Sequence, residues 1–306
     1  MSGAAGVTIL DGGLATELEA RGHDLSDRLW SARILLDDPD AIEGVHDAYF
    51  AAGADVATTA SYQATVPGLE AAGLDRDEAL ALIRRSVELA RRARDRAAAA
   101  GGSRAGGLLV AGSVGPYGAM LADGSEYRGD YDPGPAAFRD LHGPRIDALL
   151  EAGADLLAIE TIPTVREAEV LVDLVRESGA RAWLSFQCRD GTSTAAGEPI
   201  EDAVAVADGI GGVVAVGVNC TAPRHVPALL AAARADRPAA SLIAYPNGGD
   251  TWDAERRRWT SATASGTYAP DAVAGWVGLG AGWMGGCCGT GPADITALAE
   301  ALGRVR

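Results

Sequence analysis

AAGADVATTAS (residues 51–61) and EAGADLLAIET (151–161) share one pattern, and this pattern decides the fold. Each segment reads as the end of a helix, a Gly-Ala-Asp turn and then a short apolar strand. ESGARAWLSF (177–186) is a looser third copy. Repeated joints of one kind between helix and strand predict a chain that is built from repeats of a single β/α unit.

Apolar runs of strand length recur on both sides of these segments. They are mostly apolar rather than alternating, which is typical of parallel strands covered by helices. Eight strands are the number that a (β/α)8 TIM barrel requires, and its active site would lie at the carboxyl ends of the strands. An open doubly wound sheet remains the alternative, because periodicity does not reveal closure. The predicted strands are 7–10, 55–59, 108–112, 156–159, 182–186, 213–218, 242–245 and 282–284.

Helix signals lie between the predicted strands. Asp38 followed by Pro39 is typical of a helix start, and Gly53 of the helix end. Asp75 and Glu78 have the spacing of a capping box. No linker or change in composition divides the chain, so we expect a single domain over residues 1–306.

The composition excludes several classes of function. The chain of 306 residues contains no lysine, which excludes Schiff-base chemistry, pyridoxal phosphate anchoring and a P-loop. A net charge of −16 argues against nucleic acid or an anionic membrane as a partner. The sequence shows neither a run of about 20 apolar residues nor the features of a signal peptide. We therefore expect a cytoplasmic enzyme.

Polar residues follow the predicted strands at the ends where a barrel would bring them together. Two long segments, 114–134 and 246–269, also leave these ends and are expected to be lids or binding loops. The polar strand-end residues are Asp11, Gly12, Gly13, Thr59, Ser61, Tyr62, Glu160, Thr161, Asn219, Cys220, Asn247, Cys287 and Cys288.

Three of the four cysteines form a candidate metal site. Cys220, Cys287 and Cys288 all follow predicted strands, and thiolates prefer zinc. Three protein ligands without an obvious fourth are the pattern of an open site. Alternatively, Cys220 is a strand-end core residue and the other two form a reduced or disulfide-bonded pair. Cys188 has no partner motif and is expected to be a core residue.

A zinc site with three cysteine ligands suits thiol activation. A free thiol has a pKa near 8.5, and coordination to zinc deprotonates it. Three thiolates and one Zn²⁺ leave a charge of −1, so a bound substrate thiolate stays nucleophilic. This chemistry favours the transfer of an alkyl group to sulfur.

Asp11 and Glu160 are the candidate carboxylates for a substrate ammonium group. The alternative for each is a hydrogen-bond network in the barrel or a helix cap. Gly12 and Gly13 would let backbone N–H groups approach a substrate carboxylate. The histidines have no metal-binding spacing; a Cys220–His225 nucleophilic pair is conceivable, but a histidine at a helix start is preferred. Gly280-x-Gly282-x-x-Gly285 precedes a strand, unlike a dinucleotide-binding loop.

These motifs resemble those of the homocysteine S-methyltransferase family. The resemblance rests on LDGGLATELE (10–19), LWSARIL (29–35), TTASYQAT (58–65), GSVGPYGA (112–119), LLAIETIPT (156–164), GVNC (217–220), YPNGGDTWD (245–253) and GGCCGT (285–290). It covers nearly the whole chain, and the combination of NC with GGCC is specific.

The resemblance implies a (β/α)8 barrel in which Cys220, Cys287 and Cys288 bind zinc. It places Asp11 and Glu160 at the amino group of homocysteine and the Gly12-Gly13 backbone near its carboxylate. Asn247 is expected to be a further substrate contact. Tyr62 would line the face from which the methyl donor arrives, and Tyr117 or Trp252 could add a cation–π contact.

We expect direct methyl transfer from a sulfonium, S-methylmethionine or S-adenosylmethionine, to homocysteine. From the printed sequence we expect neither the C-terminal extension of betaine enzymes nor cobalamin and folate modules, which favours a sulfonium donor. One alternative is a methyltransferase that uses betaine or another thiol acceptor, and a more remote one is a non-catalytic zinc-binding protein. The sequence leaves the oligomeric state and the preferred donor open.

Overall fold

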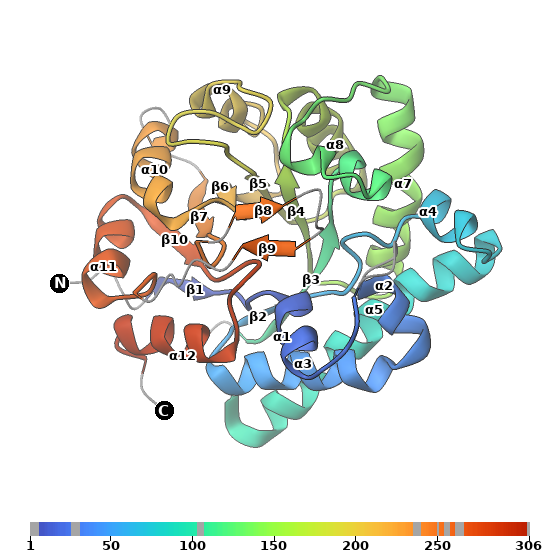
Figure 1. The fold of residues 1–306 in the computed structure, drawn as a ribbon, viewed down its shortest axis with the longest axis horizontal. Coiled ribbons are helices and arrows are strands. Elements are labelled where there is room, and N and C mark those ends of the chain that lie inside the picture. The colour runs from blue at the N-terminus through green and yellow to red at the C-terminus, as the bar shows by residue number, and fades with distance from the viewer. Residues whose placement is uncertain are drawn as a thin grey trace.

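The computed structural model describes residues 6–25, 31–102, 107–234, 240–249, 251–253, 258–260 and 266–304. Eight parallel strands form a barrel that helices surround (Figure 1). The strand order is β1-β10-β7-β6-β5-β4-β3-β2, and a parallel bridge between Leu10 and Val56 joins the two ends of this order. The predicted (β/α)8 barrel is thus confirmed, and the open sheet is excluded. The barrel strands are β1 (Thr8–Ile9), β2 (Val56–Thr58), β3 (Leu109–Val114), β4 (Leu156–Ile162), β5 (Ala182–Phe186), β6 (Val213–Asn219), β7 (Ser241–Tyr245) and β10 (Ala281–Met284).

Helices occupy the connections between the strands. The α-helices are α1 (Leu14–Ala20), α2 (Ser31–Asp37), α3 (Pro39–Ala52), α4 (Val66–Ala71), α5 (Arg76–Ala97), α6 (Tyr117–Leu121), α7 (Pro135–Glu151), α8 (Val165–Ser178), α9 (Ile200–Ala205), α10 (Val226–Arg234), α11 (Pro270–Gly278) and α12 (Pro292–Ala301). Short helical turns are η2 (Ala98–Gly102), η3 (Ser125–Tyr127) and η4 (Pro223–His225). The segment after β7 carries an antiparallel hairpin of β8 (Thr251–Asp253) and β9 (Arg258–Thr260).

The predicted helix signals act as expected. The side chain of Asp38 accepts a hydrogen bond from the backbone N–H of Ala41 at 3.2 Å, and Gly53 ends α3 with a φ of 110°. Asp75 and Glu78 form a reciprocal capping box at the start of α5. These caps satisfy backbone groups that the first turn of a helix leaves unpaired, and so fix where each helix begins.

The apolar side chains form two separate regions. The larger one lies between the strands and the helices and includes Leu184 and Phe186 of β5. The smaller one fills the barrel and includes Trp183, Ala158 and Tyr245. Because side chains alternate along a strand, β5 supplies both regions in turn. The barrel interior is therefore packed. A substrate is expected to bind at the carboxyl ends of the strands, where the loops of such barrels form the active site.

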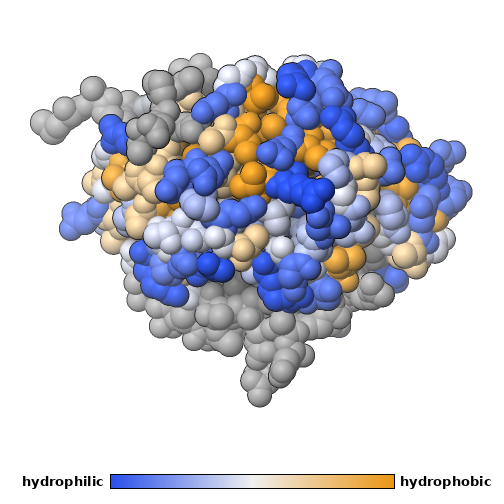
Figure 2. Space-filling view, turned by 90° about the horizontal axis from the view of Figure 1, so that it is seen from above, coloured by the Kyte–Doolittle hydropathy of each residue, from blue (hydrophilic) through white to orange (hydrophobic). Residues whose placement is uncertain are grey.

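The described residues expose few large hydrophobic side chains. Figure 2 shows one side of the molecule, where hydrophilic residues surround a smaller hydrophobic area. Leu36 is the one large hydrophobic residue among those described that is exposed, with 38% of its surface accessible to solvent. None of the helices in the described part of the chain combines the length and hydropathy that a membrane span requires.

Candidate active site at the carboxyl ends of the strands

Three cysteines meet at the carboxyl end of the barrel. The Sγ atoms of Cys220, Cys287 and Cys288 lie within 4.8 Å of one another. Tetrahedral zinc with Zn–S bonds of about 2.3 Å would separate its sulfur ligands by about 3.8 Å. The spacing and the soft donor set therefore fit a zinc ion. All three thiols are free in this structure, so Cys287 and Cys288 do not form a disulfide bond here.

Two residues at the carboxyl end of the barrel have an unusual backbone conformation. Cys220 follows β6 with a φ of 45°, and Thr161 of β4 has a φ of 62°. Such left-handed conformations are uncommon for residues other than glycine and concentrate at functional sites. The Asn219 side chain connects the two positions: its Oδ1 accepts from the N–H of Thr161 at 2.7 Å, and its Nδ2 donates to the Thr161 hydroxyl at 2.8 Å. Asn219 thereby holds the turn that aims Cys220 at the other two cysteines.

The three thiols also interact with one another. Hydrogen bonds from the thiols of Cys220 and Cys288 lower the pKa of Cys287 well below its ordinary value. The Nδ2 atom of Asn219 lies 3.8 Å from the Cys287 sulfur and acts in the same direction. One thiolate in this cluster is therefore favoured, which suits a cation-binding site.

Asp11 lies beside the cysteines at the end of β1. Its carboxylate accepts hydrogen bonds from the Thr58 N–H at 2.6 Å and the Thr58 hydroxyl at 2.8 Å. Burial raises the pKa of Asp11 to about 7, and the charge of Cys287 adds to this effect. A buried carboxylate of this kind gains from a cationic partner, which would favour its ionised form.

Glu160 lies near the carboxyl end of β4. Its carboxylate accepts hydrogen bonds from the hydroxyls of Ser113 and Tyr245. Burial raises the pKa of Glu160 to about 8, and the charges of Cys287 and Asp11 act in the same direction. Because their charges interact across the barrel opening, Asp11 and Glu160 together suit a ligand that carries an ammonium group.

The glycines after β1 pack closely against the segment that carries the cysteines. A Cβ atom on Gly12 would lie 2.9 Å from the Thr290 oxygen, and one on Gly13 would lie 2.7 Å from the Cys287 oxygen. The Gly13 N–H donates to the Thr290 carbonyl at 3.0 Å. Of the two N–H groups expected near a substrate carboxylate, only that of Gly12 has no hydrogen-bond partner within the described residues.

Asn247 is 5% exposed, and its amide binds the protein's own backbone at both ends. Its Nδ2 donates to the Cys220 carbonyl at 3.3 Å, and its Oδ1 accepts from the Gly249 N–H at 2.9 Å. This geometry suits a residue that positions Cys220 better than the substrate contact expected from the sequence.

Aromatic rings border the cysteines on the side of β2 and β3. Burial raises the pKa values of Tyr62 and Tyr127 well above their ordinary range, and both phenols are close enough to feel the charges of Cys220 and Glu126. Tyr117 instead packs against Tyr131, with ring centroids 5.6 Å apart. The side chain of Trp252, another expected donor contact, lies outside the described residues.

A buried polar network supports this aromatic side. Glu167 accepts hydrogen bonds from the Tyr117 N–H, the Tyr131 hydroxyl and the His142 Nε2, at 2.6, 2.7 and 2.8 Å. Arg145 donates to the carbonyls of Tyr62 and Gly115 and to the Nδ1 of His142. Since Nδ1 accepts from arginine, His142 is neutral and its Nε2–H donates to Glu167.

Sequence reasoning missed most of these supporting residues. Tyr245 is the last residue of β7, and Ser113 lies within the apolar run of β3. No spacing in the sequence singles out His142, yet it is fully buried between Arg145 and Glu167. The positions of these residues at strand ends or on helix faces are visible in the sequence, but the direction of their side chains is not.

The remaining predictions concern residues without a role in the site. Cys188 is 3% exposed and belongs to the apolar region outside the barrel, as expected. His225 lies in the helical turn η4 before α10, which agrees with a histidine at a helix start. Gly280 precedes β10, so the glycine pattern there does not form a dinucleotide-binding loop.

Comparisons with known proteins agree with this geometry. The family model for homocysteine S-methyltransferase matches residues 8–302. The Escherichia coli homocysteine S-methyltransferase is 50% identical over 95% of this chain and 94% of its own length. The selenocysteine Se-methyltransferase of Brassica oleracea is 42% identical over 97% of this chain and 89% of its own.

A solved structure shows the same fold. The metallated form of the E. coli homocysteine methyltransferase superposes with a TM-score of 0.86 at 48% identity, covering 96% of each chain. The match in sequence and in structure extends over the barrel and its carboxyl end. This chain therefore belongs to the homocysteine S-methyltransferase family of enzymes.

Proposed function

We propose that this enzyme transfers a methyl group from a sulfonium donor to homocysteine, and that Cys220, Cys287 and Cys288 bind the zinc ion on which the reaction depends. One observation carries the proposal: the cluster of three cysteines lies beside two buried carboxylates, Asp11 and Glu160, at the open end of the barrel. A soft metal beside an ammonium-binding pair suits an amino acid that carries a thiol. The related E. coli homocysteine methyltransferase was solved in a metallated form, which supports metal binding by this chain as well.

The two carboxylates would hold the amino group of homocysteine. An ammonium group between Asp11 and Glu160 offsets the burial that raises their pKa values to about 7 and 8. The Gly12 N–H is available for the substrate carboxylate, while Asn219 and Asn247 hold the turn at Cys220. When bound, zinc would lower the pKa of the substrate thiol so that its sulfur reacts as a thiolate.

The transfer itself needs no general acid or base. The bond between the donor sulfur and its methyl carbon breaks, and its electron pair stays on the donor sulfur, which becomes a neutral thioether. A lone pair of the homocysteine sulfur forms the new bond to carbon and gives methionine. The protein's contribution would be alignment of the two sulfur atoms and exclusion of water by Tyr62 and Tyr127.

The acceptor and donor ranges remain alternatives within this chemistry. The relative named as a selenocysteine Se-methyltransferase favours a test of selenol acceptors. Betaine is the alternative donor, and a zinc-binding protein without turnover is the more remote alternative. The cytoplasmic location expected from the sequence stays a prediction.

The first test measures methionine formation together with zinc content in the same sample. Homocysteine is offered with S-methylmethionine, S-adenosylmethionine or betaine, and selenocysteine replaces homocysteine in a second series. We expect about one zinc per chain and turnover with a sulfonium. Turnover with betaine alone would overturn the donor assignment. Zinc without turnover on any pair would favour the zinc-binding alternative.

A further inference from the structure

The chain contains two glutamines, Gln63 and Gln187, and both lie at the carboxyl end of the barrel. Gln63 follows β2, and Gln187 follows β5. The Oε1 atom of each is buried and has no hydrogen-bond partner among the described residues. Most buried polar atoms have a partner in the protein or in a ligand, so two unpaired carbonyl oxygens at one end of the barrel require an explanation.

Gln187 lies on the inner wall of the barrel opening. Trp183 and Ser185 of β5 point into the barrel, where Ser185 contacts the side chains of Asn219 and Tyr245. Alternation along the strand turns Gln187 the same way, one layer nearer the opening. Its backbone N–H still pairs with Ile162 of β4 at 3.1 Å, so the extended conformation continues to this residue. Gln187 is 9% exposed.

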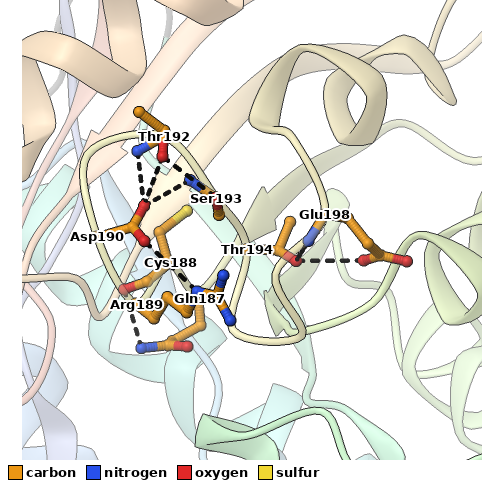
Figure 3. Close-up of polar contacts among 8 residues, drawn as sticks. All are labelled: Gln187, Cys188, Arg189, Asp190, Thr192, Ser193, Thr194 and Glu198. Carbon is orange, nitrogen blue, oxygen red and sulfur yellow. Dashed lines mark hydrogen bonds and ion pairs between the residues drawn. The ribbon is translucent and has the colours of Figure 1, made fainter.

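The loop after Gln187 is fixed by its own polar contacts (Figure 3). Asp190 accepts hydrogen bonds from the N–H groups of Thr192 and Ser193, both at 2.8 Å, and Glu198 accepts one from the Thr194 hydroxyl at 3.2 Å. The Gln187 Nε2 donates to the carbonyl of Cys188 at 3.2 Å. The loop that holds Gln187 is therefore already ordered by contacts within the protein.

Gln63, in the segment after β2, is held in the same manner. Its Nε2 donates to the carbonyl of Ala119 in α6 at 3.4 Å. It follows Tyr62, whose buried hydroxyl also has no partner of good geometry among the described residues. Thus the Oε1 atom of Gln63, next to these aromatic rings, is a second buried acceptor without a hydrogen-bond partner in the described part of the chain.

The partners of the two amides determine which atom each presents. A backbone carbonyl only accepts hydrogen bonds, so the amide nitrogen must face it. The atom left over in both residues is consequently the oxygen, which accepts hydrogen bonds. A ligand that satisfies both oxygens must supply N–H or O–H donors. The carboxylate of Glu126, near enough to raise the pKa of Tyr62, favours a donor group that carries positive charge.

We propose that Gln63 and Gln187 recognise the methyl donor by accepting hydrogen bonds from its ammonium group. The inference rests on the proposed function and deepens it, because it selects among donors. S-Methylmethionine and S-adenosylmethionine carry an ammonium with N–H donors. Betaine has a quaternary nitrogen without N–H, and dimethylsulfoniopropionate is a sulfonium without any ammonium. The last two donors cannot satisfy the glutamine oxygens.

The test replaces each glutamine by methionine, which is similar in length and cannot accept these hydrogen bonds. We expect the KM for S-methylmethionine to rise by about 10- to 100-fold in Gln187→Met and in Gln63→Met. The KM for homocysteine and the zinc content should stay at wild-type values. Thr192→Val, an exposed change in the same loop as Gln187, should leave the KM for both substrates unchanged.

Dimethylsulfoniopropionate gives the decisive comparison, because its binding should not depend on the glutamines. Its kcat/KM, or its inhibition constant if it does not react, should be the same in wild type and Gln187→Met. A wild-type KM for S-methylmethionine in Gln187→Met overturns the inference, as does an equal loss for all ligands, which indicates a structural role. If the wild type transfers methyl from neither sulfonium, the proposed function itself fails, and the inference fails with it.

Discussion

The hydroxyl of Tyr245 lies 3.2 Å from Oε2 of Glu160 and 2.9 Å from the indole nitrogen of Trp183. It accepts a hydrogen bond from the indole and donates one to the carboxylate, so it connects the packed interior of the barrel to the substrate site. The hydrogen bond from Tyr245 lowers the pKa of Glu160 against the larger effect of burial. Tyr245 thus helps to keep Glu160 ionised for a substrate ammonium.

Tyr245→Phe is therefore expected to weaken homocysteine binding without loss of zinc. The KM for homocysteine should rise about 10-fold near pH ~7.5, because the loss of one hydrogen bond to a charged group has an effect of this order. The effect should shrink at higher pH, where Glu160 ionises without help. Steady-state kinetics from about pH 6.5 to 9 check this. An unchanged KM across that range contradicts the role given to Tyr245.

The cysteine cluster gives the second prediction. Cys220→Ala, Cys287→Ala and Cys288→Ala should each lower the zinc content well below one per chain and reduce methyl transfer by at least ~100-fold, since removal of a ligand opens the site. Cys188→Ala is the matched control, because this buried cysteine lies in the apolar region outside the barrel. It should keep both zinc and activity. Metal analysis and turnover are measured on the same samples.

The position of this cluster could be predicted from the sequence for a physical reason. All carboxyl ends of parallel strands lie at one end of a barrel, so residues that follow different strands meet there. Cys220 and Cys287 are 67 residues apart in the printed numbering, yet the eight predicted strands were enough to bring them together. The helix starts at Asp38 and Asp75 were predictable because a cap depends only on neighbouring residues.

Other features depend on information that the sequence does not display. Thr161 and Cys220 have positive φ angles next to the hydrogen bonds that join Asn219 of β6 to Thr161 of β4. Burial, not residue type, raises the pKa values of Asp11 and Glu160. The sequence also suggests that both glycines after β1 serve the substrate, whereas the Gly13 N–H is used by Thr290. Each of these depends on contacts between segments that are distant in the sequence, which periodicity alone does not determine.

The raised pKa values of Asp11 and Glu160 give the third prediction. Their folded values of about 7 and 8 lie above the ordinary 3.8 and 4.5, so the folded state binds protons more tightly than the unfolded state. The contribution of these two carboxyl groups to the free energy of unfolding is fully present below about pH 4 and is lost as the pH rises through about 8. For Asp11 alone it amounts to at most about 4 kcal/mol.

Chelator-treated protein should accordingly lose stability between about pH 5 and 8, and Asp11→Asn with Glu160→Gln should flatten this slope. Denaturant unfolding at several pH values measures it. Homocysteine and zinc together should restore stability near the upper end of this range, because the ammonium favours the ionised carboxylates. If the slope is equally steep in the double variant, other groups cause it.

The last prediction concerns Arg145 and Glu167, which are both fully buried and hold the aromatic side of the site through His142. Arg145→Met removes a buried cation that interacts with the charge of Glu167 and should destabilise the fold by about 3–5 kcal/mol. It also frees the carbonyls of Tyr62 and Gly115, so the KM for the methyl donor should rise while zinc content is unchanged.

A double-mutant cycle separates this charge interaction from simple loss of packing. Glu167→Gln removes the charge that Arg145→Met leaves uncompensated, so the double variant should be more stable than the sum of the two single losses predicts. Arg139→Met, which breaks an exposed ion pair with Glu177, is the control and should leave stability near the wild-type value. Strict additivity of the two buried changes would show that Arg145 and Glu167 act independently. In that case the donor KM should follow Arg145 alone, because Arg145 is the residue that donates to the carbonyl of Tyr62.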